Sequence, residues 1–310
     1  MVDEIGIALW GPKGSGKTSM IFAFGDLVNK KYFNSKDGFI YQIQDIDGVL
    51  IDVLPPQEIK DIREGSEDAT GVNWQFSRVP NENNKNLQYA DHAYALSSHI
   101  HWIAFFDDKG DRMVEMLKTG NPDNDKTLLR IMRAQNVIIL LDPTLLVDTE
   151  YMDPATETVR FTKEKYKSMV ANLCVALSKY QADSQIINRR IAVCLTKADW
   201  LDRGRLDRAQ RSPETAWELI EEEFGSDMVS ILQRHSDIVR PFAVSAKGVE
   251  DNKWNPIGIE WPFFWLFEES EQAAIVESGN DNRLSSLKRF LFQRQRSNEY
   301  IPYPKIRWGT

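Results

Sequence analysis

Short apolar runs alternate along the chain with longer segments in which apolar residues recur at every third or fourth position. Runs of the first kind predict buried strands at residues 5–10, 102–106, 136–141, 190–195 and 238–244. The helical spacing predicts helices at 17–28, 161–180, 213–224, 258–276 and 283–292. Strands that alternate with helices favour a mostly parallel sheet covered on both faces, so the expected fold class is a three-layer α/β domain.

The segment 38–91 interrupts this alternation. It is polar and irregular, with two consecutive prolines, acidic residues near 64–68 and the asparagine-rich run 81–86. We expect an insertion or a long loop here, and short β-rich pieces between residues 74 and 106. The predicted organisation is a domain at 1–250, with the insertion inside it, followed by an aromatic and basic helical extension at 251–310.

Composition excludes several classes of protein. Of 310 residues, 42% are hydrophobic and 27% charged, which is typical of a globular core and not of a disordered chain. A net charge of −8 argues against bulk nucleic acid as a partner. The two cysteines, Cys174 and Cys194, lie in apolar runs and predict buried thiols. An acidic N-terminus and the lack of an apolar run near the ~20 residues of a membrane helix predict a cytoplasmic protein without stable membrane insertion.

The strongest chemical motif follows the first predicted strand and precedes the first predicted helix. It has the phosphate-loop pattern G-x-x-x-x-G-K-[ST], written here as Gly11-Pro12-Lys13-Gly14-Ser15-Gly16-Lys17-Thr18. Glycines let backbone N–H groups curl around a phosphate, and the helix N-terminus adds positive potential. Lys17 is expected to reach the outer phosphates and the Thr18 hydroxyl to bind Mg²⁺. The alternative is a glycine turn without a ligand.

A second motif, D-x-x-G, follows the strand predicted at 102–106. It places Asp107 where a carboxylate can bind Mg²⁺, directly or through water, and Gly110 where a backbone N–H can meet a γ-phosphate. Taken alone, the same residues are more typical of a strand that ends in a solvated acidic turn. The phosphate loop is what gives them a functional interpretation.

Two further motifs follow the last two predicted strands. The pattern [NT]-K-x-D comes after 190–195 and S-A-K comes after 238–244, so both lie at carboxyl ends of strands, where ligands bind in open α/β sheets. The carboxylate of the first motif can accept from the guanine ring N–H and from the exocyclic amine, which adenine lacks, while the lysine stem covers the base. The candidate base-binding residues are Thr196, Lys197, Asp199, Ser245, Ala246 and Lys247.

In this order the four motifs resemble those of the Ras-like and translation-factor (TRAFAC) class of P-loop GTPases, over residues 4–248. The insertion, the tryptophan-rich segment after S-A-K and the long chain are similar to the bacterial double-GTPase group. The resemblance implies GTP and GDP binding with Mg²⁺, hydrolysis of GTP, and a nucleotide-dependent switch toward a protein effector or a partner GTPase.

The chain departs from that family after D-x-x-G. Ras-like enzymes place a water-orienting glutamine there, whereas this chain has Asp111, so we expect slow turnover without a partner. For the first-switch threonine that binds Mg²⁺ the candidate is Thr70, the alternative being an ordinary turn residue. Arg63 and Arg78 flank it as candidate arginine fingers, each also interpretable as a surface residue.

Three other features have structural interpretations that we favour. His99 and His101 would face one side of a strand but lack an obvious third metal ligand. The aromatic residues near 254–267 are typical of core packing. From residue 283 onward the chain has seven basic residues and one acidic residue. This positive charge suits docking on the acidic domain or on a partner.

Two alternative functions remain open at this point. The first is a GTP-binding scaffold, or one subunit of a GTPase pair, with little hydrolysis of its own; Asp111 keeps it open. The second is an ATP-using P-loop enzyme, for which the T-K-x-D match at 196–199 would be coincidental.

Overall fold

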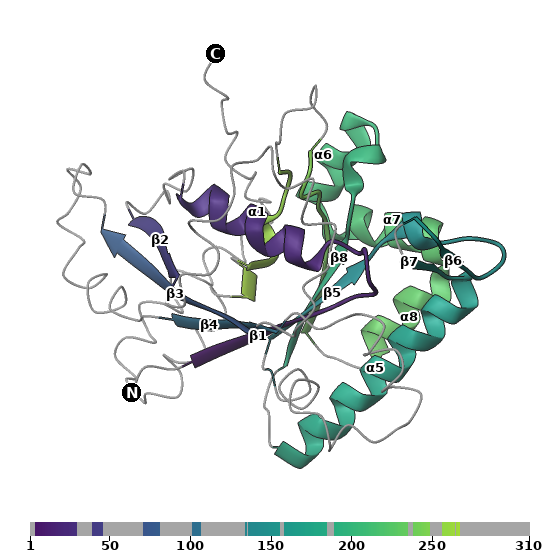
Figure 1. Cartoon of the computed structure of the whole chain (residues 1–310), viewed down its shortest axis with the longest axis horizontal. Coiled ribbons are helices and arrows are strands. Elements are labelled where there is room, and N and C mark those ends of the chain that lie inside the picture. Colours follow the sequence, from purple (N-terminus) through teal and green to yellow (C-terminus); the bar gives the residue numbers. More distant parts are fainter. Residues whose placement is uncertain are drawn as a thin grey trace, which may run out of the picture.

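A seven-stranded sheet crosses the centre of the protein (Figure 1). The computed structural model describes residues 4–29, 39–45, 71–80, 101–106, 134, 136–155, 158–184, 189–234, 238–248, 256–263 and 265–266. In these residues the strand order of the sheet is β2-β3-β4-β1-β5-β8-β9. Its strands are β1 (Glu4–Trp10), β2 (Phe39–Asp45), β3 (Gly71–Pro80), β4 (His101–Phe106), β5 (Asn136–Leu141), β8 (Arg190–Leu195) and β9 (Ile238–Ala243).

Five neighbouring strands of this sheet, from β4 to β9, are parallel. They are the five strands that the apolar runs predicted, and β5 and β8 have the predicted bounds. Both are buried along their whole length, which is the reason for their continuous apolar sequence. The mostly parallel α/β sheet is therefore confirmed.

The predicted insertion at 38–91 contains two strands. β3 lies mostly in the part from residue 74 onward where short β-rich pieces were predicted, whereas the prediction of an irregular segment is wrong for β2. β2 and β3 pair with each other antiparallel, with Ile43 opposite Phe76, and β3 pairs antiparallel with β4. They add two strands to one edge of the sheet. The sequence of β2, FIYQIQD, is rich in β-branched and aromatic residues, but the polar residues around it hid this pattern. Residues 46–70 and 81–91 lie outside the described part.

Helices cover both faces of the sheet, which gives the three predicted layers (Figure 1). Along β5, Val137, Ile139 and Leu141 point to one apolar cluster while Ile138 and Leu140 point to the other. The second cluster includes α1 and residues 259–266, and the first includes the remaining helices. The helices are α1 (Lys17–Asn29), α5 (Lys163–Ser184), α6 (Arg203–Arg211), α7 (Pro213–Phe224) and α8 (Ser226–Arg234).

Capping residues explain where the helices near β9 begin and end. α7 has the predicted bounds because Ser212 accepts a hydrogen bond from the Thr215 N–H, proline follows it, and Gly225 ends the helix with φ +90°. The sequence analysis missed α6 and α8. α6 consists mostly of charged residues and buries only Leu206 and Ala209 in the core, so its apolar pattern is sparse.

The segment after β9 packs on the same face of the sheet as α1. Residues 260–263 and 265–266 are helical. Phe263 stacks on Phe24 of α1, with 4.0 Å between the ring centroids, and Trp265 lies 6.0 Å from Phe242 of β9. Core packing of the aromatic residues is thus confirmed for Phe263 and Trp265. The rest of the predicted extension from residue 267 on lies outside the described residues.

The two cysteines are free, buried thiols, as predicted. Burial raises the pKa of Cys174 to about 12 and that of Cys194 further still, so both stay protonated and packed in the core. No helix among the described residues is both long and apolar enough to cross a bilayer.

A buried acid at the start of the helical segment 260–263 makes the stability of the fold depend on pH. Burial raises the pKa of Glu260 to about 7, so the folded protein holds this proton at pH values where the unfolded chain releases it. Stability from this group falls as pH rises from about 4.5 to about 7 and is constant above. We predict that Glu260→Gln removes this fall, a difference of a few kcal/mol between pH 5 and pH 8, on the order of ~1.4 kcal/mol per pKa unit.

Urea unfolding of wild type and variant at both pH values measures the effect. Glu214→Gln is the matched control, because the Ser212 hydroxyl lowers the pKa of the exposed Glu214 and the effect has the opposite sign. An equal pH dependence of Glu260→Gln and wild type would contradict the assignment.

Candidate nucleotide site

The phosphate loop lies between β1 and α1, as its motif predicts. The Ser15 N–H donates to the Pro12 carbonyl at 3.1 Å, and α1 starts with the Met20 N–H donating to the Gly16 carbonyl at 2.8 Å. Gly14 and Gly16 have φ values of +84° and +93°, which side chains other than glycine rarely adopt. The glycines of the motif are therefore required by the backbone path of the loop.

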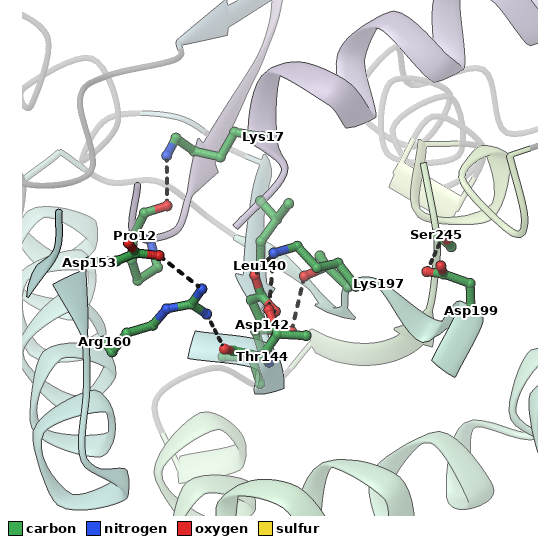
Figure 2. A network of polar contacts seen from close by, with 12 residues as sticks. Pro12, Lys17, Leu140, Asp142, Thr144, Asp153, Arg160, Lys197, Asp199 and Ser245 are labelled. Carbon is green, nitrogen blue, oxygen red and sulfur yellow. Dashed lines mark hydrogen bonds and ion pairs between the residues drawn. The ribbon is translucent and has the colours of Figure 1, made fainter. Parts of the chain in front are cut away.

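The loop is tightly packed around Gly11, whereas the space beside Gly16 is open. A Cβ atom at Gly11 would lie 2.4 Å from the Ser15 hydroxyl oxygen. That hydroxyl is fully buried and has no hydrogen-bond partner among the residues that the structure describes. The Lys17 ammonium folds over the loop and donates to the carbonyls of Gly11 and Pro12 at 2.8 and 3.2 Å (Figure 2). A buried donor without a partner beside an ammonium group suits an anionic, oxygen-rich ligand such as a phosphate.

The two motifs after β8 and β9 form one loop cluster at the carboxyl edge of the sheet. The Ser245 hydroxyl donates to Asp199 Oδ1 at 2.7 Å and accepts from the Gly248 N–H at 3.1 Å. The Ala198 N–H donates to the Val244 carbonyl at 3.0 Å. The Ser245 hydroxyl thus orients the Asp199 carboxylate, and the main-chain bond holds the loop of T-K-x-D against that of S-A-K.

Lys197 forms an ion pair that the sequence analysis did not foresee. Its ammonium group lies 2.6 Å from Asp142 Oδ2 and donates to Thr144 Oγ1 at 3.0 Å (Figure 2). Asp142 directly follows β5 and its side chain is fully buried, whereas that of Lys197 is 42% exposed. Lys197 itself has a φ of +55°, in the left-handed region. The pair holds this strained residue, and with it the loop before Asp199, against the end of β5.

Neighbouring groups fix Asp142 in turn. Its Oδ1 accepts from the N–H and the hydroxyl of Thr144, so Asp142 caps the short 3₁₀ helix η4 (Pro143–Leu145). Its own N–H donates to the Tyr166 hydroxyl at 3.3 Å, which donates to the Leu140 carbonyl at 3.2 Å. Burial raises the pKa of Tyr166 well above its ordinary value, so this hydroxyl keeps the proton that it donates.

The structure brings most of the predicted site residues to one edge of the sheet. β1, β5, β8 and β9 are parallel neighbours, so the loops after them share the carboxyl edge. These loops contain Gly11, Lys13, Gly14, Ser15, Gly16, Lys17, Thr18, Thr196, Lys197, Asp199, Ser245, Ala246 and Lys247.

The other predicted site residues lie outside the described part of the chain: Thr70, Asp107, Gly110 and Asp111. β4 ends at Phe106, which is paired with Ala8 of β1, so the described strand stops one residue before the second motif. Arg63 and His99 are also outside, and Arg78 and His101 are described only as backbone in β3 and β4. Within the described residues no group of three or more His, Cys, Asp or Glu side chains forms a metal site.

Three residues of the site were missed: Asp142, Thr144 and Arg160. Arg160 lies in the hairpin of β6 (Tyr151–Asp153) and β7 (Thr158–Arg160), between β5 and α5. One signal was available, since Asp142 follows a buried strand in the same way as Asp107 does. Strands of three residues are too short for an alternating pattern to show, so the hairpin had no such signal.

Comparison with known proteins gives distant structural likenesses. No family model and no curated protein matches the chain. The signal recognition particle receptor SRb-GTP/SRX complex from Chaetomium thermophilum matches over 84% of this chain and 97% of that chain, with 14% identity and a TM-score of 0.38. Nucleolar GTP-binding protein 1 from Plasmodium falciparum matches over 92% and 97%, with 9% identity and a TM-score of 0.36. At this distance we base no functional assignment on either.

Proposed function

We propose that this protein binds GTP with Mg²⁺ at the carboxyl edge of its sheet, hydrolyses it to GDP and phosphate, and switches a protein partner with the nucleotide state. The observation that carries the proposal is the joint placement of the phosphate loop and the Ser245-oriented Asp199 carboxylate at one edge. The phosphates and the base of one nucleotide would thus find binding groups on loops at the same edge of the sheet.

At the phosphate end, the loop 11–18 would hold the β- and γ-phosphates. A phosphate oxygen is a stronger acceptor than the carbonyls of Gly11 and Pro12, so Lys17 would exchange these carbonyls for the ligand. The Thr18 hydroxyl would ligate Mg²⁺, together with Asp107 and Thr70, which lie outside the described residues. When bound, Mg²⁺ neutralises charge that develops on the phosphate oxygens.

At the base end, Asp199 would discriminate guanine from adenine. Its carboxylate only accepts hydrogen bonds, and guanine offers two donors on one edge, the ring N–H and the exocyclic amine. Adenine has an unprotonated ring nitrogen at that edge, which would face the carboxylate as acceptor against acceptor. Thr196, Lys197, Ala246 and Lys247 lie on the same two loops and would contact the base from its face and its carbonyl edge.

In the reaction, water attacks the γ-phosphorus, the bond to the bridging oxygen of GDP breaks, and the water proton leaves with the phosphate or to solvent. Gly110 would donate its N–H to the γ-phosphate. Asp111 would orient the water, but its charge repels the γ-phosphate, so turnover is slow until a partner contributes. Membership of the TRAFAC class, and of its double-GTPase group, is part of this proposal and rests on the four motifs.

A change of base specificity tests the base site. In Asp199→Asn the side-chain NH₂ group can donate to the 2-carbonyl of xanthine. The same group would face the exocyclic amine of guanine as donor against donor. We predict that GTP affinity falls about a hundredfold or more and that affinity for xanthosine triphosphate rises.

Equilibrium titration of both nucleotides with wild type and variant measures this exchange. Asp202→Asn is the matched control, because Asp202 lies three residues away, caps α6, and asparagine caps a helix equally well. Unchanged GTP affinity in Asp199→Asn would overturn the assignment of the base site.

Phosphate release from bound GTP separates a GTPase from the GTP-binding scaffold that Asp111 leaves open. We predict slow release in a single turnover with Mg²⁺, and a rate lower by about a hundredfold or more in Lys17→Ala, because the ammonium neutralises the transferred phosphoryl group. Lys163→Ala, on the exposed start of α5, is the control. Tight GTP binding without release would favour the scaffold.

A further inference from the structure

The β6–β7 hairpin is rigidly attached at the carboxyl edge of the sheet. Past its end, the Phe161 N–H donates to the Leu145 carbonyl at 2.8 Å and the Val147 N–H donates to the Phe161 carbonyl at 2.9 Å. Val159, on β7, packs against the larger apolar cluster. The hairpin therefore has a fixed position relative to β5 and to the short helix η4 that follows it.

One strand of the hairpin lies close to the phosphate loop. A Cβ atom added at Gly14 would lie 3.2 Å from Thr158 Cγ2 and 3.5 Å from its hydroxyl oxygen, so Thr158 lies beside Gly14 and limits the space at the tip of the loop. Thr158 is buried, with 7% of its surface exposed. The contact is made at a residue with positive φ, where the loop backbone is already constrained.

The same strand contacts the loop that pairs with Lys197. The Arg160 Nη1 group donates to the Thr144 carbonyl, and Nη2 lies 3.9 Å from Asp153 on the opposite strand (Figure 2). The Thr144 hydroxyl in turn accepts from Lys197 and donates to Asp142 at 2.7 Å. A set of polar contacts thus runs from the hairpin through Thr144 to Lys197, two residues before Asp199.

Resting on the proposed function, we propose that the β6–β7 hairpin is a strut that couples the phosphate end of the nucleotide site to its base end, with Arg160 as a positioning residue. The strut holds Gly14 through Thr158 and Lys197 through Thr144. A nucleotide bound between the two ends can leave only when the loops that hold it loosen, so the strut slows dissociation. Neither Arg160 nor Thr158 needs to touch the nucleotide for this effect.

The hydrogen bond to the Thr144 carbonyl distinguishes Arg160 from an ordinary surface arginine. The ion pair with Asp153 is long, and both side chains are 24% exposed, so by itself it contributes little. A guanidinium that donates to a main-chain carbonyl fixes backbone and not only another side chain. That carbonyl belongs to the residue whose hydroxyl accepts from Lys197.

Dissociation rates test the strut. Full-length wild type, Arg160→Ala, Arg160→Lys and Met152→Ala are loaded with fluorescent GDP or GTP and chased with unlabelled nucleotide. We expect dissociation about tenfold faster for Arg160→Ala with both nucleotides, as for loss of a hydrogen bond with a charged donor, and partial recovery for Arg160→Lys. Met152 is the matched control, since it lies on the same hairpin with 61% of its surface exposed. Melting temperatures of wild type and variants are measured without nucleotide. We expect equal values, which would show that Arg160→Ala changes the dissociation rate without unfolding the protein.

A double variant tests whether the effect passes through Thr144. If Arg160 acts through the bond to Thr144, Thr144→Val and Arg160→Ala together change the rate less than the product of the single effects. A rate of Arg160→Ala within about twofold of wild type, or strictly multiplicative effects, would overturn the strut. Wild type that binds no guanine nucleotide would instead overturn the proposed function, and the strut with it.

Discussion

A buried carboxylate is the constraint around which this site is arranged. The Asp142 side chain has no exposed surface. Removing a carboxylate from water costs several kcal/mol of solvation free energy, unless a cation and hydrogen-bond donors replace the solvent. Lys197 supplies the cation and Thr144 supplies two donors. Compensating one charge therefore fixes the loop after β8, the short helix after β5 and, through Thr144, the hairpin that lies beside the phosphate loop.

The parallel sheet places the loops of the proposed nucleotide site at one edge. Neighbouring parallel strands deliver their following loops to one edge, and the ladder continues past the strands, with the Thr196 N–H donating to the Leu141 carbonyl at 2.9 Å. The loops are thus fixed by backbone bonds as well as by side chains. What differs between them is chemistry: an ammonium and a buried hydroxyl at the phosphate loop, and a carboxylate oriented by Ser245 at the other end.

Sequence reasoning succeeded where a residue's role is local. The phosphate loop needs positive φ at Gly14 and Gly16, and β5 and β8 are buried on both faces, so motif and apolar run were sufficient. It failed where the determinant is a contact between distant segments. The Asp142–Lys197 pair joins residues 55 positions apart, and β2 owes its place to pairing with β3. Neither contact leaves a periodic pattern in its own segment.

We propose that the fixed Asp199 carboxylate and the phosphate loop together select a guanine nucleotide. Calorimetric titration of the wild-type protein with GTP and, separately, with ATP, both with Mg²⁺, measures this selectivity. We expect GTP to bind at least about a hundredfold more tightly than ATP, because adenine presents an acceptor to a carboxylate that only accepts. Equal affinities for the two nucleotides would contradict it and would make the T-K-x-D match a coincidence.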